Sequence, residues 1–362
     1  VHDLGKANIV FQSKINKELD VIKTQEIPHG FLSAMTTSPE EFKNHIPEAD
    51  NDDYKAFYTA VYHHHVREDK NGDDIILNFC KKYYNPYIRD FLNDESIKAK
   101  VSGINKYLLF RNTGSISGSK YIMSCYDKNE YLHEWQEFVL IKGLLNKFDY
   151  TVSAGYTEAE DCSAFTTKYL KTSIENIFQQ HGLRPVQEYM RDKCDKNLVV
   201  VAPTGMGKTE SALFWSNGEK TFFTLPIRTS INAIYDRINE SIGYQHIGLL
   251  HSTALDYLEE KDEFGNQEEI YRQSQNLSQK ITACTIDQIF PFVFKYKGYE
   301  KMYATLSYSK LIIDEIQAYS PEIVAIIIKG LEMIYKIGGK FMIMTATCLL
   351  YTSDAADDRI SV

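Results

Sequence analysis

The stretch from Leu198 to Thr209 reads LVVVAPTGMGKT, and it decides the fold of the second half of the chain. Four apolar residues predict a buried strand, and the residues after Lys208 predict a helix. A glycine-containing loop therefore joins the end of a strand to the start of a helix. Such a loop directs backbone N–H groups at phosphate oxygens, aided by the N-terminus of the helix. The stretch predicts a nucleotide-binding loop in an α/β sheet.

The segments around this loop predict a parallel sheet. Short apolar runs recur through the second half, mostly with helical stretches between them, at 198–202, 221–225, 247–250, 280–284, 310–314 and 340–345. Strands that alternate with helices are typical of a parallel sheet covered on both faces. Ligands of such sheets bind beyond the carboxyl ends of the strands.

The loop residues have expected roles at ATP. Lys208 is predicted to reach the β- and γ-phosphates, and the Thr209 hydroxyl to hold Mg²⁺. Thr204, Gly205 and Gly207 complete the predicted phosphate cradle. A chance turn could carry the same short motif, but the strand before it and the helix after it favour a nucleotide site.

A second apolar run ends in two carboxylates. Residues 311–313 lead directly into Asp314 and Glu315. Asp314 is predicted to bind Mg²⁺, mostly through water, and Glu315 to polarise the attacking water. A solvated acidic turn would look the same in isolation. Its pairing with the phosphate loop favours a nucleoside triphosphatase.

Weaker signals follow the order of a superfamily-two helicase, in which the first loop position, here Ala202, need not be glycine. Gln187 lies before the phosphate loop and is expected to read adenine. Arg228, Thr229 and Thr285 follow predicted strands and are candidates for contacts with a single-stranded backbone. The run 345–347, Thr-Ala-Thr, resembles the motif that couples hydrolysis to movement on DNA. None of these signals is specific alone, but their order makes coincidence improbable.

The first half reads differently. Apolar residues at three- and four-residue steps, as in 75–84 and 134–148, predict helices. Between and on them lie His2, Asp3, His29, Asp149 and the triplet His63, His64 and His65. An adjacent His-Asp pair can give one metal an imidazole and bridge two metals through its carboxylate. Histidine nitrogens with shared carboxylates suit Mn, Fe, Co or Ni, and two such metals can activate water for phosphodiester cleavage.

Each part of this set also has an ordinary structural reading. A lone His-Asp pair is usually surface chemistry, and three consecutive histidines can form a polar helix face. Taken together, and with Gly5-Lys6 directly after the pair, they favour a metal site.

Composition sets fewer limits. The net charge is −9, yet a local basic groove can coexist with an acidic whole, so charge neither favours nor excludes DNA. The six cysteines are scattered without a CxxC pair, which argues against a zinc ribbon or a disulfide framework and suits a cytoplasmic protein. No apolar run of membrane-spanning length is present.

The order His-Asp, His, His-His, Asp, followed by the helicase pattern, resembles the CRISPR-associated HD nuclease–helicase family of type I interference systems. The segments that carry the resemblance lie at 4–12, 29–34, 63–65, 143–149, 202–209, 314–319 and 345–347. The resemblance implies an all-α HD domain over 1–155, a linker at 156–180 and an α/β RecA-like parallel-sheet lobe over 181–348. Residues 349–362 do not continue the pattern, and we expect a non-native or disordered tail there.

Carried over by motif, one metal is implied to be held by His2, Asp3 and Asp149, with Asp3 bridging. The second metal is implied to be held by His29 and two residues of the histidine triplet. The family has two adjacent histidines at that place, so we favour His64 and His65 and leave His63 open. Lys6 matches a lysine near the scissile phosphate.

The resemblance further implies ATP with Mg²⁺, single-stranded DNA as substrate, 3′-to-5′ movement and recruitment by a Cascade-type surveillance complex. We expect a monomer. The chain begins at Val1, after an upstream histidine ligand of the family pattern, and carries no second RecA-like lobe, so we expect a fragment with weakened chemistry. Two alternatives stay open: a stand-alone HD nucleotide phosphohydrolase, and a non-catalytic remnant that binds ATP and DNA.

Overall fold

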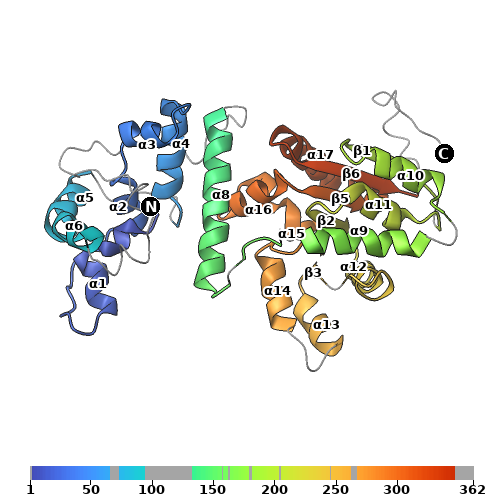
Figure 1. Ribbon diagram of the computed structural model, residues 1–362, viewed down its shortest axis with the longest axis horizontal. Coiled ribbons are helices and arrows are strands. Elements are labelled where there is room, and N and C mark those ends of the chain that lie inside the picture. Colours follow the sequence, from blue (N-terminus) through green and yellow to red (C-terminus); the bar gives the residue numbers. More distant parts are fainter. Residues whose placement is uncertain are drawn as a thin grey trace. The chain divides into compact units, whose positions relative to one another are not determined.

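A computed structural model describes residues 2–65, 73–93, 133–156, 158–161, 164–178, 182–203, 205–244, 246–261 and 267–346 (Figure 1). The chain divides into two compact units, Val1–Asn146 and Lys147–Val362. The predicted tail at 349–362 lies outside the described residues. In the described ranges, no helix is both long enough and apolar enough to cross a membrane.

The described part of the first unit is helical. Its elements are η1 (Leu4–Ala7), α1 (Ile9–Ile15), α2 (His29–Ala34), α3 (Pro39–His45), α4 (Asn51–Tyr62), α5 (Asp73–Phe79), η2 (Cys80–Tyr84), α6 (Asn85–Asn93) and the first part of α8 (His133–Ser153). The division between the units falls within α8.

The helices α2 and α4 form the centre of this unit. A capping box starts α4: the Asp50 side chain accepts from the backbone N–H of Asp53, and the Asp53 side chain accepts from that of Asp50. Phe31 of α2 stacks on Tyr62 of α4, with ring centroids 4.0 Å apart. Because His29 begins α2 and the histidine triplet directly follows Tyr62, this packing also fixes where the histidines lie.

The second unit contains a six-stranded, fully parallel sheet in the order β1-β6-β5-β2-β4-β3. The strands are β1 (Leu198–Val201), β2 (Thr221–Leu225), β3 (Ile247–Leu250), β4 (Ile281–Thr285), β5 (Lys310–Asp314) and β6 (Lys340–Thr345). Each lies within one residue of a predicted strand. The predicted fold class, a helical region followed by an α/β parallel-sheet lobe, is confirmed.

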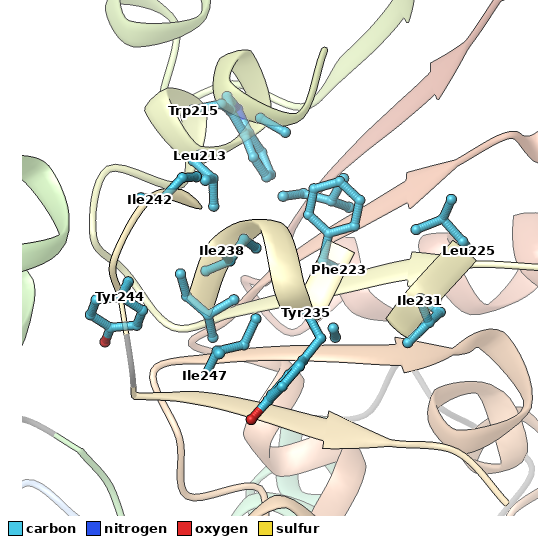
Figure 2. Packing of buried hydrophobic residues seen from close by; sticks show 14 of the residues in the cluster. Leu213, Trp215, Phe223, Leu225, Ile231, Tyr235, Ile238, Ile242, Tyr244 and Ile247 are labelled. Carbon is cyan, nitrogen blue, oxygen red and sulfur yellow. The ribbon is translucent and has the colours of Figure 1, made fainter. Parts of the chain in front are cut away.

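Helices lie before the first strand and between successive strands. They are α9 (Ala164–Phe178), α10 (Pro185–Asp192), α11 (Lys208–Ser216), α12 (Arg228–Asp236), η6 (Arg237–Ser241), α13 (Ala254–Lys261), α14 (Gln267–Gln275), α15 (Ile286–Ile289), η7 (Phe290–Phe294), α16 (Tyr299–Leu306), η8 (Ile316–Ala318) and α17 (Pro321–Lys336). Figure 2 shows Trp215 of α11, Phe223 of β2 and Ile238 of η6 in the core between sheet and helices. All three side chains are at most 1% exposed.

The segment predicted as a linker contains an ordered helix. Ile174 of α9 is 2% exposed and belongs to the core of the second unit. Part of 156–180 therefore packs on the lobe, while the exact domain bounds stay a prediction.

Two buried lysines share one carboxylate in the second unit. Lys147 and Lys220 both contact Glu160, and both donate to the backbone oxygen of Leu277. Burial, reinforced by the neighbouring charge of Lys220, lowers the pKa of Lys147 to about 7.

We expect the stability of this unit to rise with pH above neutrality. The unfolded pKa of lysine is about 10.4, so between about pH 7 and 10 the folded state binds fewer protons than the unfolded state. Below that range Lys147 is charged in both states, and above it neutral in both. Denaturant midpoints measured from pH 7 to pH 9 should rise more steeply for the wild type than for Lys147→Met. Equal slopes would contradict this assignment.

Candidate functional site

The phosphate loop depends on two glycines in left-handed conformations. Gly205 has φ +87° and Gly207 has φ +78°, a region that side chains disfavour. A Cβ atom on Gly207 would also lie 2.9 Å from Nε2 of Gln187. Gly207 caps α11, which begins at Lys208, so this helix N-terminus follows the loop as predicted. Thr204 lies outside the described residues.

Lys208 lies opposite the two predicted acidic residues. Its Nζ is 3.9 Å from Oδ1 of Asp314 and 3.3 Å from Oε1 of Glu315. Only β6 separates β1 from β5 in the sheet, so the carboxyl ends of these strands meet at one edge. Burial raises the pKa of Asp314, and the nearby Lys208 ammonium counteracts this. Thr209, in the first turn of α11, is also buried.

A chain of contacts extends from Glu315 to the last strand. Gln317 donates from Nε2 to Oε2 of Glu315. The hydroxyl of Thr345 donates to Oε1 of Gln317 over 2.6 Å. Lys208, Glu315, Gln317 and Thr345 thus form one connected polar network. Thr347, the last residue of the predicted third motif, lies outside the described residues.

Gln187 packs against the phosphate loop at Gly207. It is 1% exposed, and its Oε1 accepts from the backbone N–H of Arg184 over 2.9 Å. Arg184 itself donates from Nη1 to the backbone oxygen of Gly205 over 2.7 Å. Both residues therefore support the phosphate loop. The expected reading of adenine by Gln187 stays a prediction.

The predicted DNA contacts lie at the carboxyl ends of β2 and β4. Arg228 and Thr229 are exposed at the start of α12, whereas Thr285, which ends β4, is 5% exposed. Arg228 donates to the hydroxyl of Ser252 over 3.1 Å. His251 directly follows β3 and is buried, and its Nε2 lies 2.7 Å from Oδ1 of Asn232.

Sequence reasoning missed the association of 251–253 with Arg228. Residues 251–253 directly follow a predicted buried strand, as the other candidate residues do, and this position could have revealed them.

The Asp3 carboxylate lies close to a lysine and two histidines in the first unit. Asp3 precedes η1, and its Oδ1 lies 2.8 Å from Nζ of Lys6 and 3.3 Å from Nε2 of His29. Its Oδ2 lies 3.5 Å from Nε2 of His2. Burial acts to raise the pKa of Asp3, but the contacts with His29 and Lys6 outweigh it and hold the pKa well below its usual range.

Three imidazoles converge beside Asp3. One nitrogen each of His29, His64 and His65 lies within 4.8 Å of the others. Nδ1 of His64 is 2.6 Å from the backbone oxygen of Val61. Since a carbonyl only accepts, Nδ1 carries the hydrogen and Nε2 presents its lone pair. That Nε2 lies 3.1 Å from Nε2 of His29.

Burial keeps His64 neutral. It lowers the pKa of His64 to about 3, so the imidazole is deprotonated near neutral pH, as metal binding requires. The donor set fits a divalent transition metal.

Two glycines let the segments with the predicted metal ligands approach each other closely. A Cβ atom on Gly5 would lie 2.0 Å from the backbone oxygen of His29. One on Gly30 would lie 2.7 Å from Nδ1 of His64. The glycines in the predicted Asp-Leu-Gly and His-Gly segments are thus required by close packing.

The remaining predicted ligands have different settings. The ring of His63 packs against Phe31 and Tyr62, and the side chain is 4% exposed. The structure therefore groups His64 and His65 with His29 and directs His63 into the core. Asp149 lies on the part of α8 assigned to the second unit, and its role as a ligand stays a prediction.

The parallel sheet and the glycine-containing loop are the features that the sequence predicted for a RecA-like helicase lobe. Residues 184–352 match the family model described as DEAD/DEAH box helicase. The phosphate loop, the paired carboxylates and the parallel sheet all fall within this range.

The chain as a whole is similar to a more particular group. It is 28% identical to the CRISPR-associated nuclease/helicase Cas3 of Methanothermobacter thermautotrophicus, over 96% of this chain and 47% of that protein. It resembles the structure of T. fusca Cas3 with ADP, with a TM-score of 0.60 and 15% identity, over 96% of this chain and 43% of that one. It also resembles a chain of a structure described as "CRISPR RNA-guided surveillance complex, pre-nicking", with a TM-score of 0.53 and 16% identity, over 96% of this chain and 40% of that one.

These similarities confirm the predicted resemblance, for a helicase of the Cas3 type. The chain spans about half the length of the relatives it matches, 47% and 43% for the first two. The HD domain stays a prediction, which the proximity of Asp3, His29 and His64 in the first unit supports.

Glu315 offers a test of strain at the nucleotide site. Its φ is +56°, which a side chain tolerates only at a cost. We expect Glu315→Gly to be more stable than Glu315→Ala by about 1 kcal/mol, because glycine enters this region freely. Both variants should lose ATP turnover equally. Thermal denaturation and phosphate release would measure the two effects; an alanine variant as stable as the glycine variant would contradict the strain.

Proposed function

We propose that this chain supplies the nuclease domain and the first helicase lobe of a CRISPR-associated enzyme that degrades invader DNA with the help of ATP. The observation that carries the proposal is the contact of Lys208 with Asp314, which ends β5, and with Glu315, the next residue. This is the arrangement that a phosphate loop and a metal-binding strand need in order to act on one nucleotide.

In the helicase lobe, ATP is the substrate. Lys208 would bind the β- and γ-phosphates, and Thr209 and Asp314 would hold the Mg²⁺ that accompanies them. Glu315 would orient the attacking water. Gln317 hydrogen-bonds to Glu315, and Thr345 hydrogen-bonds to Gln317. A change in the position of Glu315 on loss of the γ-phosphate would therefore alter the contacts at the end of β6.

In the first unit, the residues present fit a pair of divalent transition metals. His29, His64 and His65 would hold one, and His2 and Asp3 the other, with Asp3 shared; Asp149 is kept as a ligand by resemblance. When bound there, such metals would supply the activation of water and the stabilisation of the leaving oxygen that phosphodiester cleavage needs. Lys6, whose Nζ lies 2.8 Å from Asp3, would place a positive charge beside the scissile phosphate.

The proposed substrate is single-stranded DNA, moved 3′ to 5′, and the proposed partner is a Cascade-type surveillance complex. Support comes from the similarity to Cas3 proteins and to a chain of the pre-nicking surveillance complex. The proposal places the protein in the cytoplasm as a monomer.

One experiment separates this function from a stand-alone nucleotide phosphohydrolase. Circular single-stranded DNA and deoxynucleoside triphosphates would each be incubated with the chain and Mn²⁺, Ni²⁺ or Co²⁺. We expect metal-dependent cleavage of the circle. Hydrolysis of the nucleotides at the first unit, with the circle intact, would overturn the proposal in favour of the phosphohydrolase.

A further inference from the structure

Two aromatic rings lie exposed on a tight turn of the second unit. Phe294 ends η7 and is 51% exposed, and Tyr296 follows two residues later at 66%. Their rings stack on each other, with centroids 5.6 Å apart and planes 26° apart. Large apolar rings lose stabilisation when they stay in water, so an exposed and pre-stacked pair calls for an explanation beyond folding.

The turn is held firmly from inside. Phe292 of η7 is 1% exposed and stacks on Tyr303 of α16, with centroids 5.2 Å apart and planes only 8° apart. Lys295 takes a left-handed φ of +52°, and its N–H donates to the backbone oxygen of Phe292 over 3.0 Å. The outward rings therefore stand on a buried aromatic base and are ordered before any ligand arrives.

The charge next to these rings is positive. From Ile289 to Tyr308 the charged residues are Lys295, Lys297, Glu300 and Lys301. Glu300 is 1% exposed, whereas Lys297 is exposed. In a chain of net charge −9, this turn is a locally basic and aromatic surface.

A small hollow adjoins Tyr296. It has a volume of about 150 Å³ and is lined in part by Tyr296, Lys297, Tyr299 and Met302. Pockets for whole drug-sized ligands occupy ~300–1,000 Å³, so this hollow is too small for a complete nucleotide cofactor. A planar base placed against Tyr296 is a better match.

We propose that Phe294 and Tyr296, with Lys295, Lys297 and the adjoining hollow, form a stacking platform for the bases of single-stranded DNA. Single-strand binding surfaces combine aromatic side chains, on which any base can stack, with lysines that follow the phosphates. Along the chain, Thr285, a predicted backbone contact, is followed directly by α15 and then by η7, which ends at Phe294. The inference rests on the proposed function, because it names a site at which that DNA is held.

The test is the binding of a labelled oligothymidylate to the full chain, measured by fluorescence anisotropy. Tyr296→Ala should weaken binding ~5- to 150-fold, the range that corresponds to loss of one stacked base. Tyr296→Trp should retain binding. Tyr335→Ala is the matched control, since Tyr335 on α17 is 65% exposed but, among the described residues, stacks on no other aromatic ring.

Two further arms separate stacking from charge. An oligonucleotide with abasic positions should bind the wild type more weakly, yet should bind Tyr296→Ala with little further loss. Lys297→Ala should reduce the slope of log affinity against log salt by ~0.7, as expected for one lost phosphate contact on a single strand.

The outcomes also separate this inference from the proposed function. If Arg228→Ala weakens binding while Tyr296→Ala binds as the wild type does, the platform is wrong and DNA binding by the lobe stands. If Tyr296→Ala equals wild type on both normal and abasic DNA, the turn serves another partner. If the wild type binds no oligonucleotide, the platform and the single-stranded substrate both fail.

Discussion

Lys208→Ala is expected to lower ATP turnover ~10²–10³-fold, the usual cost of removing one positioned electrostatic group from a reacting centre. Lys208 is the cation that faces Asp314 and Glu315, at 3.9 and 3.3 Å. Its loss would remove the ammonium group that is proposed to bind the β- and γ-phosphates, so ATP binding should weaken as well as hydrolysis. Phosphate release, with and without single-stranded DNA, measures the turnover.

Thermal stabilisation by ATP gives a second measurement, which reports nucleotide binding and does not need hydrolysis. A ligand at a hundred times its Kd stabilises the folded state by about 2.7 kcal/mol, and the variant should lose most of this gain. Lys196→Ala is a matched control, because Lys196 is exposed and pairs only with its neighbour Asp195 in the described contacts. If Lys208→Ala were stabilised by ATP as fully as Lys196→Ala, the nucleotide site would be misplaced.

Asp3→Ala should reduce Mn²⁺-dependent nicking of single-stranded DNA by at least ~10²-fold. Replacing a residue that only orients a metal ligand already lowers metal affinity or activity ~10–100-fold. Asp3 is itself a predicted ligand and lies against His2, His29 and Lys6, so its loss should have at least this effect. A chelator should abolish nicking in the wild type, and added Mn²⁺ should restore it. Nicking by Asp3→Ala at the wild-type rate would refute the HD assignment.

Metal-induced stabilisation checks the same site without catalysis. The increase in melting temperature on adding Mn²⁺ should be lost in His64→Ala, whose Nε2 lies 3.1 Å from Nε2 of His29. His246→Ala, at an exposed position of the second unit, should keep it. His63→Ala should lower stability, since its ring packs on Phe31, but should leave the metal response in place.

The sequence did not determine which residues of the histidine triplet face His29. Three adjacent imidazoles offer equivalent donors, so the sequence favoured His64 and His65 only by resemblance and left His63 open. The structure distinguishes them because α4 ends at Tyr62, whose ring is stacked on Phe31. This turns His63 inward and leaves His64 and His65 facing His29. The choice depends on where a helix ends against its neighbour, which is a packing property.

The sequence alone determined the strands of the second unit, because buried parallel strands are continuous apolar runs with helices between them. It also determined the phosphate loop, whose glycines adopt conformations that only glycine enters readily. Both features are local, so residue type and spacing are enough to predict them.

Only the tertiary structure decided how the separate motifs meet. The strand order brings Lys208 to Asp314 and Glu315, although the phosphate loop and β5 are far apart in the chain. Packing also decided that Gln187 supports the loop and that Phe294 and Tyr296 stay outside while Phe292 goes in. Such outcomes depend on which surfaces cover one another, and no spacing within the sequence encodes them directly. The stretch Leu198–Thr209 could thus be recognised from the sequence, but its position opposite Asp314 and Glu315 was decided by the fold.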